Sequence, residues 1–177
     1  MDIPLVAVGS ADGPETSRVQ QRLLDLGFWL QSTNGDYGVT TSQAVMAFQK
    51  YAGLDANSEV DEVTAAALNS ATTRAYGTAN QGTLIEVDKD RQLLFIIQEA
   101  NTVWTINVST GSGIPFKERD ENEWGKWVHG DAVTPDGIFV IDRQVEDGWR
   151  EGDLGDIYRP KYFNKGIALH GAYKIPN

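Results

Sequence analysis

The spacing of apolar residues changes once along this chain, and that change constrains the fold more than any other feature. Before residue 70 the apolar residues recur at helical intervals, as in amphipathic helices. After residue 82 they gather in short β-rich runs separated by turns. We therefore expect two parts of different secondary structure, joined near residues 70–82.

Three helices are predicted in the first part. The run SRVQQRLLDLG carries Ser17 and Gln20 at the spacing of an N-terminal capping box. The run TTSQAVMAFQKYAG repeats this box with Thr40 and Gln43. A weaker third helix, EVTAAALN, follows a loop. Residues 14–69 are therefore expected to form a small three-helix domain with a core of its own.

The second part is predicted to be mostly β. TLIEVD, RQLLFIIQ and TVWTINVST are β-rich runs parted by short turns, as in a meander of hairpins. After a long polar segment, TPDGIFVIDRQV is expected to form a strand, and RPKYFNKGIALHG the last buried one. SATTRAYGTANQG, residues 70–82, lacks large apolar residues and is predicted to be a linker. The expected fold class is α+β, with residues 83–177 forming a sheet or sandwich.

Composition excludes several classes of function. Twenty-five Asp and Glu against 15 Lys and Arg give a net charge of -10, which opposes binding to nucleic acid. No apolar run is long enough to span a membrane, and the first residues lack the features of a secretion signal. Without cysteine there is no disulfide and no thiol nucleophile in these residues. Two histidines without metal-binding spacing predict no metal and no cofactor.

The first part resembles a family that binds the bacterial cell wall. VQQRLLDLGF, then NGDYGVTTSQAVMAFQKYAGL, then a second turn and VTAAAL are similar to the peptidoglycan-binding module found beside cell-wall enzymes. The family's second Asp-Gly turn is replaced here by NSEVDEVT. The resemblance implies peptidoglycan as the partner and a groove beside the first turn and the second helix. Phe28, Asp36 and Tyr37 are its candidate lining residues, although the aromatic rings fit a core equally well.

The second part resembles the catalytic domain of the L,D-transpeptidases. EVDKDRQLLFII, VSTGSG, TPDGIFVIDRQ and GWREGDLGDIYRPKYFNKGIALHG follow one another as in that family. Its members crosslink the stem peptides of peptidoglycan through a cysteine acyl-enzyme. The resemblance implies that His170 is the general base, and that a Ser-His-Gly-Cys motif should follow it. We expect the chain to be truncated before this motif, and we name Tyr162, Phe163 and Gly171 as substrate-side candidates.

These expectations combine into two hypotheses about function. In the first, the chain is a secreted, actinobacterial-looking cell-wall protein of the L,D-transpeptidase family, inactive over these 177 residues because they contain no thiol. In the second, it is a non-catalytic protein whose degenerate catalytic domain only docks on the wall. Cysteine content decides whether the chain can be an enzyme by itself.

Overall fold

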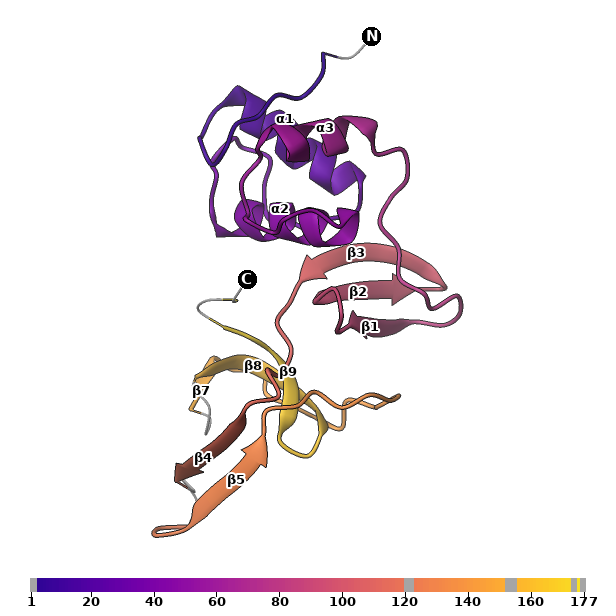
Figure 1. Ribbon diagram of the computed structural model, residues 1–177. Coiled ribbons are helices and arrows are strands. Elements are labelled where there is room, and N and C mark those ends of the chain that lie inside the picture. Colours follow the sequence, from indigo (N-terminus) through magenta and orange to yellow (C-terminus); the bar gives the residue numbers. More distant parts are fainter. Residues whose placement is uncertain (1–2, 120–122, 152–155, 173–174, 176–177) are drawn as a thin grey trace. The chain divides into compact units, whose positions relative to one another are not determined.

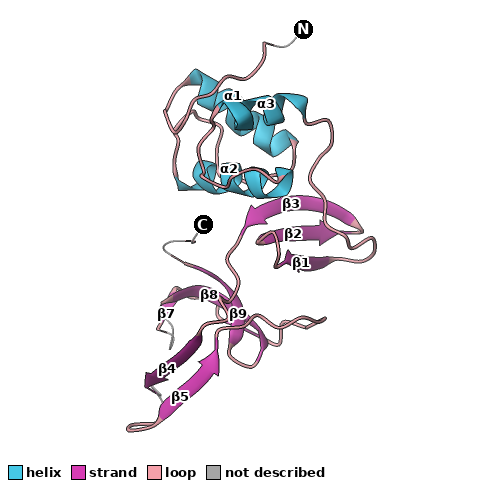
Figure 2. Ribbon diagram, viewed as in Figure 1, coloured by secondary structure: helices cyan, strands magenta, loops and turns pink. Residues whose placement is uncertain are grey.

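Helices come first and strands follow, as the change of apolar spacing predicts (Figures 1 and 2). In this computed structural model, residues 1–109 form one compact unit and residues 110–176 a second. Parts of the long polar segment and of the run GWREGDLGD, residues 120–122 and 152–155, lie outside the described residues. The structure describes residues 3–119, 123–151, 156–172 and 175.

The three predicted helices are confirmed, but their predicted capping boxes are wrong. The helices are α1 (Pro14–Asp25), α2 (Val39–Ala52) and α3 (Glu62–Ser70). Glycines cap α1 and α2, at Gly13 and Gly38, and neither helix has a side-chain cap. Only α3 has one, because Asp61 accepts a hydrogen bond from the Thr64 backbone N–H at 2.7 Å.

The side chains predicted to cap helices make tertiary contacts instead. Ser17 Oγ donates to the carbonyl oxygen of Thr33 at 2.5 Å. Gln43 Oε1 accepts from Asn107 Nδ2 at 2.7 Å, which joins α2 to a strand. Local spacing cannot separate a capping glutamine from one that reaches a distant partner.

Gln20 on α1 is completely buried and holds the first turn of the helical module, residues 34–38. Its Nε2 donates to the carbonyl of Asp36 and to Thr41 Oγ1, both at 2.8 Å. Its Oε1 accepts from the Gly35 N–H at 2.9 Å. All of these bonds satisfy polar groups that burial would otherwise leave unpaired.

Gln49 on α2 is equally buried and holds the second turn in the same way. Its Nε2 donates to the carbonyl of Glu59 at 2.8 Å and to Thr64 Oγ1 at 3.0 Å, while its Oε1 accepts from the Ser58 N–H at 2.9 Å. In both turns the glutamine bonds to a backbone N–H, to the carbonyl of the next residue, and to the threonine hydroxyl five residues after that. The two halves of the helical module are therefore structural repeats, and the NSEVDEVT turn forms despite its altered sequence.

The predicted meander is confirmed as β1 (Leu84–Asp88), β2 (Leu93–Gln98) and β3 (Asn101–Asn107), an antiparallel sheet in that order. Every second side chain of β2 is fully buried and joins the same core as the helices; these are Leu93, Phe95 and Ile97. Helix α2 runs along β3 in Figure 1. The helices and the first three strands therefore share one hydrophobic core.

The predicted linker, residues 70–82, is held along its length by both neighbours. Arg74 donates to the last carbonyls of α1, at 3.0 and 3.2 Å, and to the carbonyl of Val103 in β3 at 2.9 Å. Ala75 is only 2% exposed and belongs to the shared core. The domain boundaries at residues 69 and 83 stay a prediction, because this packing joins both sides in one unit.

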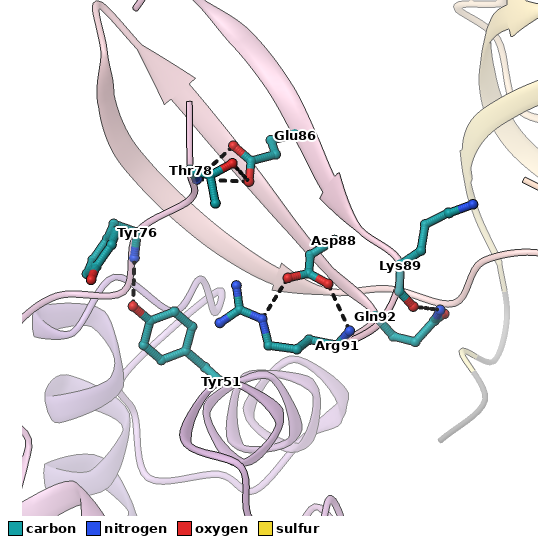
Figure 3. Close-up of polar contacts among 8 residues, drawn as sticks. All are labelled: Tyr51, Tyr76, Thr78, Glu86, Asp88, Lys89, Arg91 and Gln92. Atoms are coloured by element: carbon teal, nitrogen blue, oxygen red, sulfur yellow. Dashed lines mark hydrogen bonds and ion pairs between the residues drawn. The ribbon is translucent and has the colours of Figure 1, made fainter. Parts of the chain in front are cut away.

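Polar contacts fix the same segment along β1 (Figure 3). The Tyr76 N–H donates to Tyr51 Oη at 3.2 Å, and the N–H and hydroxyl of Thr78 donate to the Glu86 carboxylate at 2.9 to 3.0 Å. Nearby, the Arg91 guanidinium lies 5.2 Å from the centre of the Tyr51 ring, a cation–π distance. These contacts tie the segment to α2 through Tyr51 and to β1 through Glu86.

In the second unit, β8 (Ile157–Asn164) is the central strand. It pairs with β6 (Arg143–Gln144), β7 (Trp149–Arg150) and β9 (Ile167–Gly171), all antiparallel. A separate hairpin is formed by β4 and β5, which span Pro115–Arg119 and Trp127–Asp131.

The prediction of a strand in TPDGIFVIDRQV is wrong for most of that run. Only β6 forms there, and Ile138 and Val140 before it are 102% and 79% exposed. Apolar letters form a strand only where a neighbour supplies hydrogen bonds, and β8 pairs with just two residues of this run. Pro160 is the one buried residue among the described residues of the second unit.

The repeat predicts opposite effects for two substitutions at equivalent turn positions. Ser58 has a φ of 62°, so Ser58→Gly should relieve backbone strain and raise the free energy of unfolding by about 1 kcal/mol. Gly35 has a φ of 89°, and an added Cβ would lie 2.7 Å from the Gly13 carbonyl oxygen. Gly35→Ser should therefore lower it by about 2 kcal/mol or more. Urea denaturation of the whole chain measures both, and destabilisation by Ser58→Gly would contradict the repeat.

The cap of α3 predicts a pH-dependent contribution to stability. The hydrogen bond from the Thr64 N–H, helped by its hydroxyl, lowers the pKa of Asp61 below its ordinary value. A carboxylate with a lowered folded pKa stabilises the fold above its unfolded pKa, about 3.9, and this stabilisation is lost as the pH falls through the folded pKa. Asp61→Ala should thus destabilise the chain by about 1 kcal/mol at pH 7 and by less below pH ~4.

Asp61→Asn is the matched control, because asparagine caps a helix without titrating in this range. Its stability relative to Asp61→Ala should not change between pH 7 and about pH 3. Thermal unfolding over that range checks both variants. An Ala effect that stays constant with pH would show that the carboxylate charge is not what caps α3.

Candidate functional site

A groove lies beside the first turn and the start of α2, where the family resemblance implies one. Its volume is about 240 Å³. Asp36, a predicted lining residue, contributes to its wall and accepts a hydrogen bond from Asn34 Nδ2 at 2.5 Å. The full lining consists of Gln31, Ser32, Asn34, Asp36, Gly38, Val39, Thr40 and Thr41.

The chemistry of this groove is polar but not cationic. Hydroxyl and amide groups predominate, and Asp36 is the one charged side chain that lines it. Val39 adds an apolar surface that is 76% exposed. Such a lining can exchange hydrogen bonds with neutral hydroxyl and amide groups, but it offers no positive charge to a carboxylate.

The other two predicted lining residues lie outside the groove. Phe28 is 1% exposed and packs edge-to-face against Phe48 and Tyr51, with ring centres 5.6 and 5.8 Å apart. Tyr37 is half-buried, and its hydroxyl donates to the carbonyl of Ser58 at 2.6 Å. Burial, and then the nearby Glu59 carboxylate, raise the pKa of the Tyr37 phenol, so it stays a neutral donor that joins the two turns.

The hydroxyl and amide residues of the groove were missed in the sequence. Gln31 and Ser32 are scattered polar letters with no motif of their own, and Thr40 was predicted only as a helix cap. The backbone N–H of Gln31 donates to Thr40 Oγ1 at 3.3 Å. This bond holds the segment before NGDYG against the start of α2. The one available signal was their position on both sides of NGDYG.

His170, the predicted base, is exposed near the end of β9. Residues 167–169 before it are half-buried, so the strand is less buried than predicted. Nδ1 of His170 lies 3.0 Å from the carbonyl oxygen of Gly171. If Nδ1 carries the proton, it donates to that oxygen and leaves Nε2 unprotonated and able to accept a proton.

The register of β8 and β9 separates the two aromatic candidates. Tyr162 pairs with Ala168, and Ala168 and His170 lie on the same face of β9, since side chains alternate along a strand. Tyr162 therefore shares the His170 face, whereas Phe163 lies in a register shift between Tyr162 and Asn164 and pairs with no residue of β9. The Arg143 guanidinium stacks 3.8 Å from the centre of the Tyr162 ring.

Phe163 and Gly171 have packing partners that explain their positions. The Phe163 ring lies 5.4 Å from that of Phe139. Gly171 pairs with Tyr158, and a Cβ added to it would lie 3.2 Å from Tyr158 Cβ. A larger side chain at Gly171 would crowd the tyrosine.

In the described part of the chain, no group of three or more histidine and acidic side chains is placed to hold a metal ion. None of the helices there is both long enough and apolar enough to cross a bilayer.

Comparison with protein-family profiles finds two domains. A peptidoglycan-binding domain matches residues 12–68, and an L,D-transpeptidase catalytic domain matches residues 82–176. Together they define a protein with a wall-binding module followed by an acyl-transfer domain. The second match covers more than half of the chain, which therefore belongs to the L,D-transpeptidase family.

One solved structure, at 37% identity, agrees with this assignment. The L,D-transpeptidase from Xylanimonas cellulosilytica is 37% identical, with a TM-score of 0.83, and the match covers 99% of this chain and 83% of that one. An L,D-transpeptidase from Stackebrandtia nassauensis is 15% identical, with a TM-score of 0.42, over 98% of this chain and 80% of that one. A search of curated proteins finds no match. The predicted family and fold class are confirmed.

Proposed function

We propose that this protein binds peptidoglycan through the groove beside its first turn and acts on the bacterial cell wall, outside the cytoplasm. The observation that carries the proposal is the groove itself. It lies in the domain that matches the peptidoglycan-binding family, and its lining of hydroxyl and amide groups suits the neutral glycan of the wall. Exposed Val39 suits the apolar face of a sugar ring.

We further propose that the second domain takes part in stem-peptide crosslinking, with His170 as general base. In this reaction a thiol attacks an amide carbonyl, and His170 removes the thiol proton through Nε2. The C–N bond then breaks, the histidine returns a proton to the departing amine, and an acceptor amine displaces the thiolate. Tyr162, Phe163 and Gly171 remain candidate substrate contacts, and the strand register places Tyr162 on the face of His170.

The reaction requires a thiol, and residues 1–177 contain no cysteine. We propose that these residues supply the base and the wall-binding groove but do not form the acyl-enzyme by themselves. The same observation favours a second candidate function, a non-catalytic protein that docks on the wall. Both candidate functions have peptidoglycan as the partner.

Wall binding is tested by two matched substitutions in the 177-residue chain. Val39 and Val63 are both exposed valines in the first turn of a helix, and only Val39 lines the groove. Val39→Asp should reduce co-sedimentation with insoluble peptidoglycan about fivefold or more, because it replaces the apolar contact with a charge. Val63→Asp should leave it unchanged. Failure of the unsubstituted chain to sediment would overturn the proposal, and equal sedimentation of the two variants would remove the groove from it.

Incubation with a carbapenem tests the acyl step. We expect no increase in the mass of the intact 177-residue chain, because no thiol is present to be acylated. A cysteine-containing member of the family provides the positive control. A covalent adduct on this chain would contradict the proposal and would indicate a nucleophile other than cysteine.

A further inference from the structure

One face of the β4–β5 hairpin gathers positive charge around an aromatic ring. The strands pair antiparallel, with Lys117 opposite His129 and Arg119 opposite Trp127. Directly opposed residues in a sheet share a face, and alternate residues along each strand share it too. Lys117, Arg119, Trp127 and His129 therefore lie on one face, together with Asp131; we call this the cationic face.

Both cations lie against the indole. Lys117 Nζ is 4.9 Å and Arg119 Cζ is 5.6 Å from the centre of the Trp127 ring, and this side chain is 46% exposed. Cation–π contacts of this kind hold the two charges near the ring without neutralising them. Among the residues that the structure describes, no carboxylate is within ion-pair distance of Lys117 or Arg119.

Two cations gathered on one aromatic ring stand out in a chain with a net charge of -10. Several other described cations, among them Arg18, Arg91 and Arg159, each have a carboxylate partner, whereas Lys117 and Arg119 share the Trp127 ring instead. An open pocket of about 480 Å³ adjoins the cationic face, with Lys117, His129 and Asp131 in its wall. Space for a ligand therefore lies next to Lys117, which has no carboxylate partner within the described residues.

The chemistry of the cationic face selects an anion with an apolar part. Lys117 and Arg119 can bind carboxylates, and the exposed edge of Trp127 can cover an aliphatic segment. Asp131, on the same face, can accept an ammonium group. A peptide that carries carboxylates, methylene groups and an amine fits all three, whereas a phosphate polymer offers Asp131 nothing to bind.

We propose that the cationic face binds the carboxylates of the peptidoglycan stem peptide. The inference rests on the proposed function, which makes peptidoglycan the partner. It also deepens that proposal, because the groove in the first unit has no positive charge and so suits the glycan, while the hairpin supplies the charges that the peptide requires. The two components of the wall are thus recognised by different surfaces of the chain.

The test uses the 177-residue chain and a soluble stem tetrapeptide, either with free carboxylates or with every carboxylate converted to an amide. Isothermal titration calorimetry at low salt should show that the acid form binds about tenfold tighter or more, and raised salt should remove much of this preference. The double variant Lys117→Gln/Arg119→Gln should bind both forms equally weakly. The control is Lys126→Gln, which removes a cation from the loop between the two strands and should keep the preference.

Three results of the titration would overturn the inference. They are equal binding of both peptide forms by the unsubstituted chain, no binding of either form, and a preference that survives in the double variant. Displacement of the acid peptide by polyphosphate at lower concentration than by free peptide would also overturn it, in favour of a phosphate polymer.

Failure of the proposed function gives a different result. The double variant should still co-sediment with whole peptidoglycan through the groove, and this sedimentation should still be sensitive to Val39→Asp. If the chain binds stem peptide but never sediments in a Val39-dependent manner, the groove proposal fails and the cationic face stands. Near-ultraviolet circular dichroism of each variant establishes that the fold is intact.

Discussion

The first unit depends on the burial of one face of β2 against the helices. Leu93, Phe95 and Ile97 are fully buried in the core that α1 and α2 begin, and a core of this kind is the main source of stability in a small unit. The other connections follow from this contact. Arg74 can bond to both α1 and β3 only because the sheet already lies against the helices.

Two buried glutamines then hold the two turns of the helical module. Each holds a turn by its side-chain amide, and the first of these turns borders the groove. A buried amide with every bond satisfied specifies one backbone arrangement, because any other would leave polar atoms unpaired. The phenol of Tyr37 links the two turns, so the shape of the groove is tied to the packing of the whole module.

The sequence predicted what apolar spacing controls and missed what distant polar partners control. The helices and the first three strands were predictable because their apolar faces follow simple periods. The caps were not, since Gln20 and Gln43 look like surface residues until their partners in the fold are known. Residues 138–141 show the opposite failure. Their apolar residues predicted a strand, but none forms there because β8 does not pair with them. His170 was named as a candidate base through family resemblance, whereas the groove hydroxyls and the cationic face needed the structure.

The shared core also limits how such a protein can change during evolution. Wall-binding modules are often treated as cassettes that can be joined to any enzyme. Here the module ends near residue 68 in the family profile, yet its hydrophobic core continues through Ala75 into β2. Recombination at the profile boundary would separate Phe95 from the Tyr51 ring, whose centre lies 6.5 Å from its own. Gene exchange that preserves both parts must therefore break the chain after β3, and the inherited unit is larger than the domain that the family profile delimits.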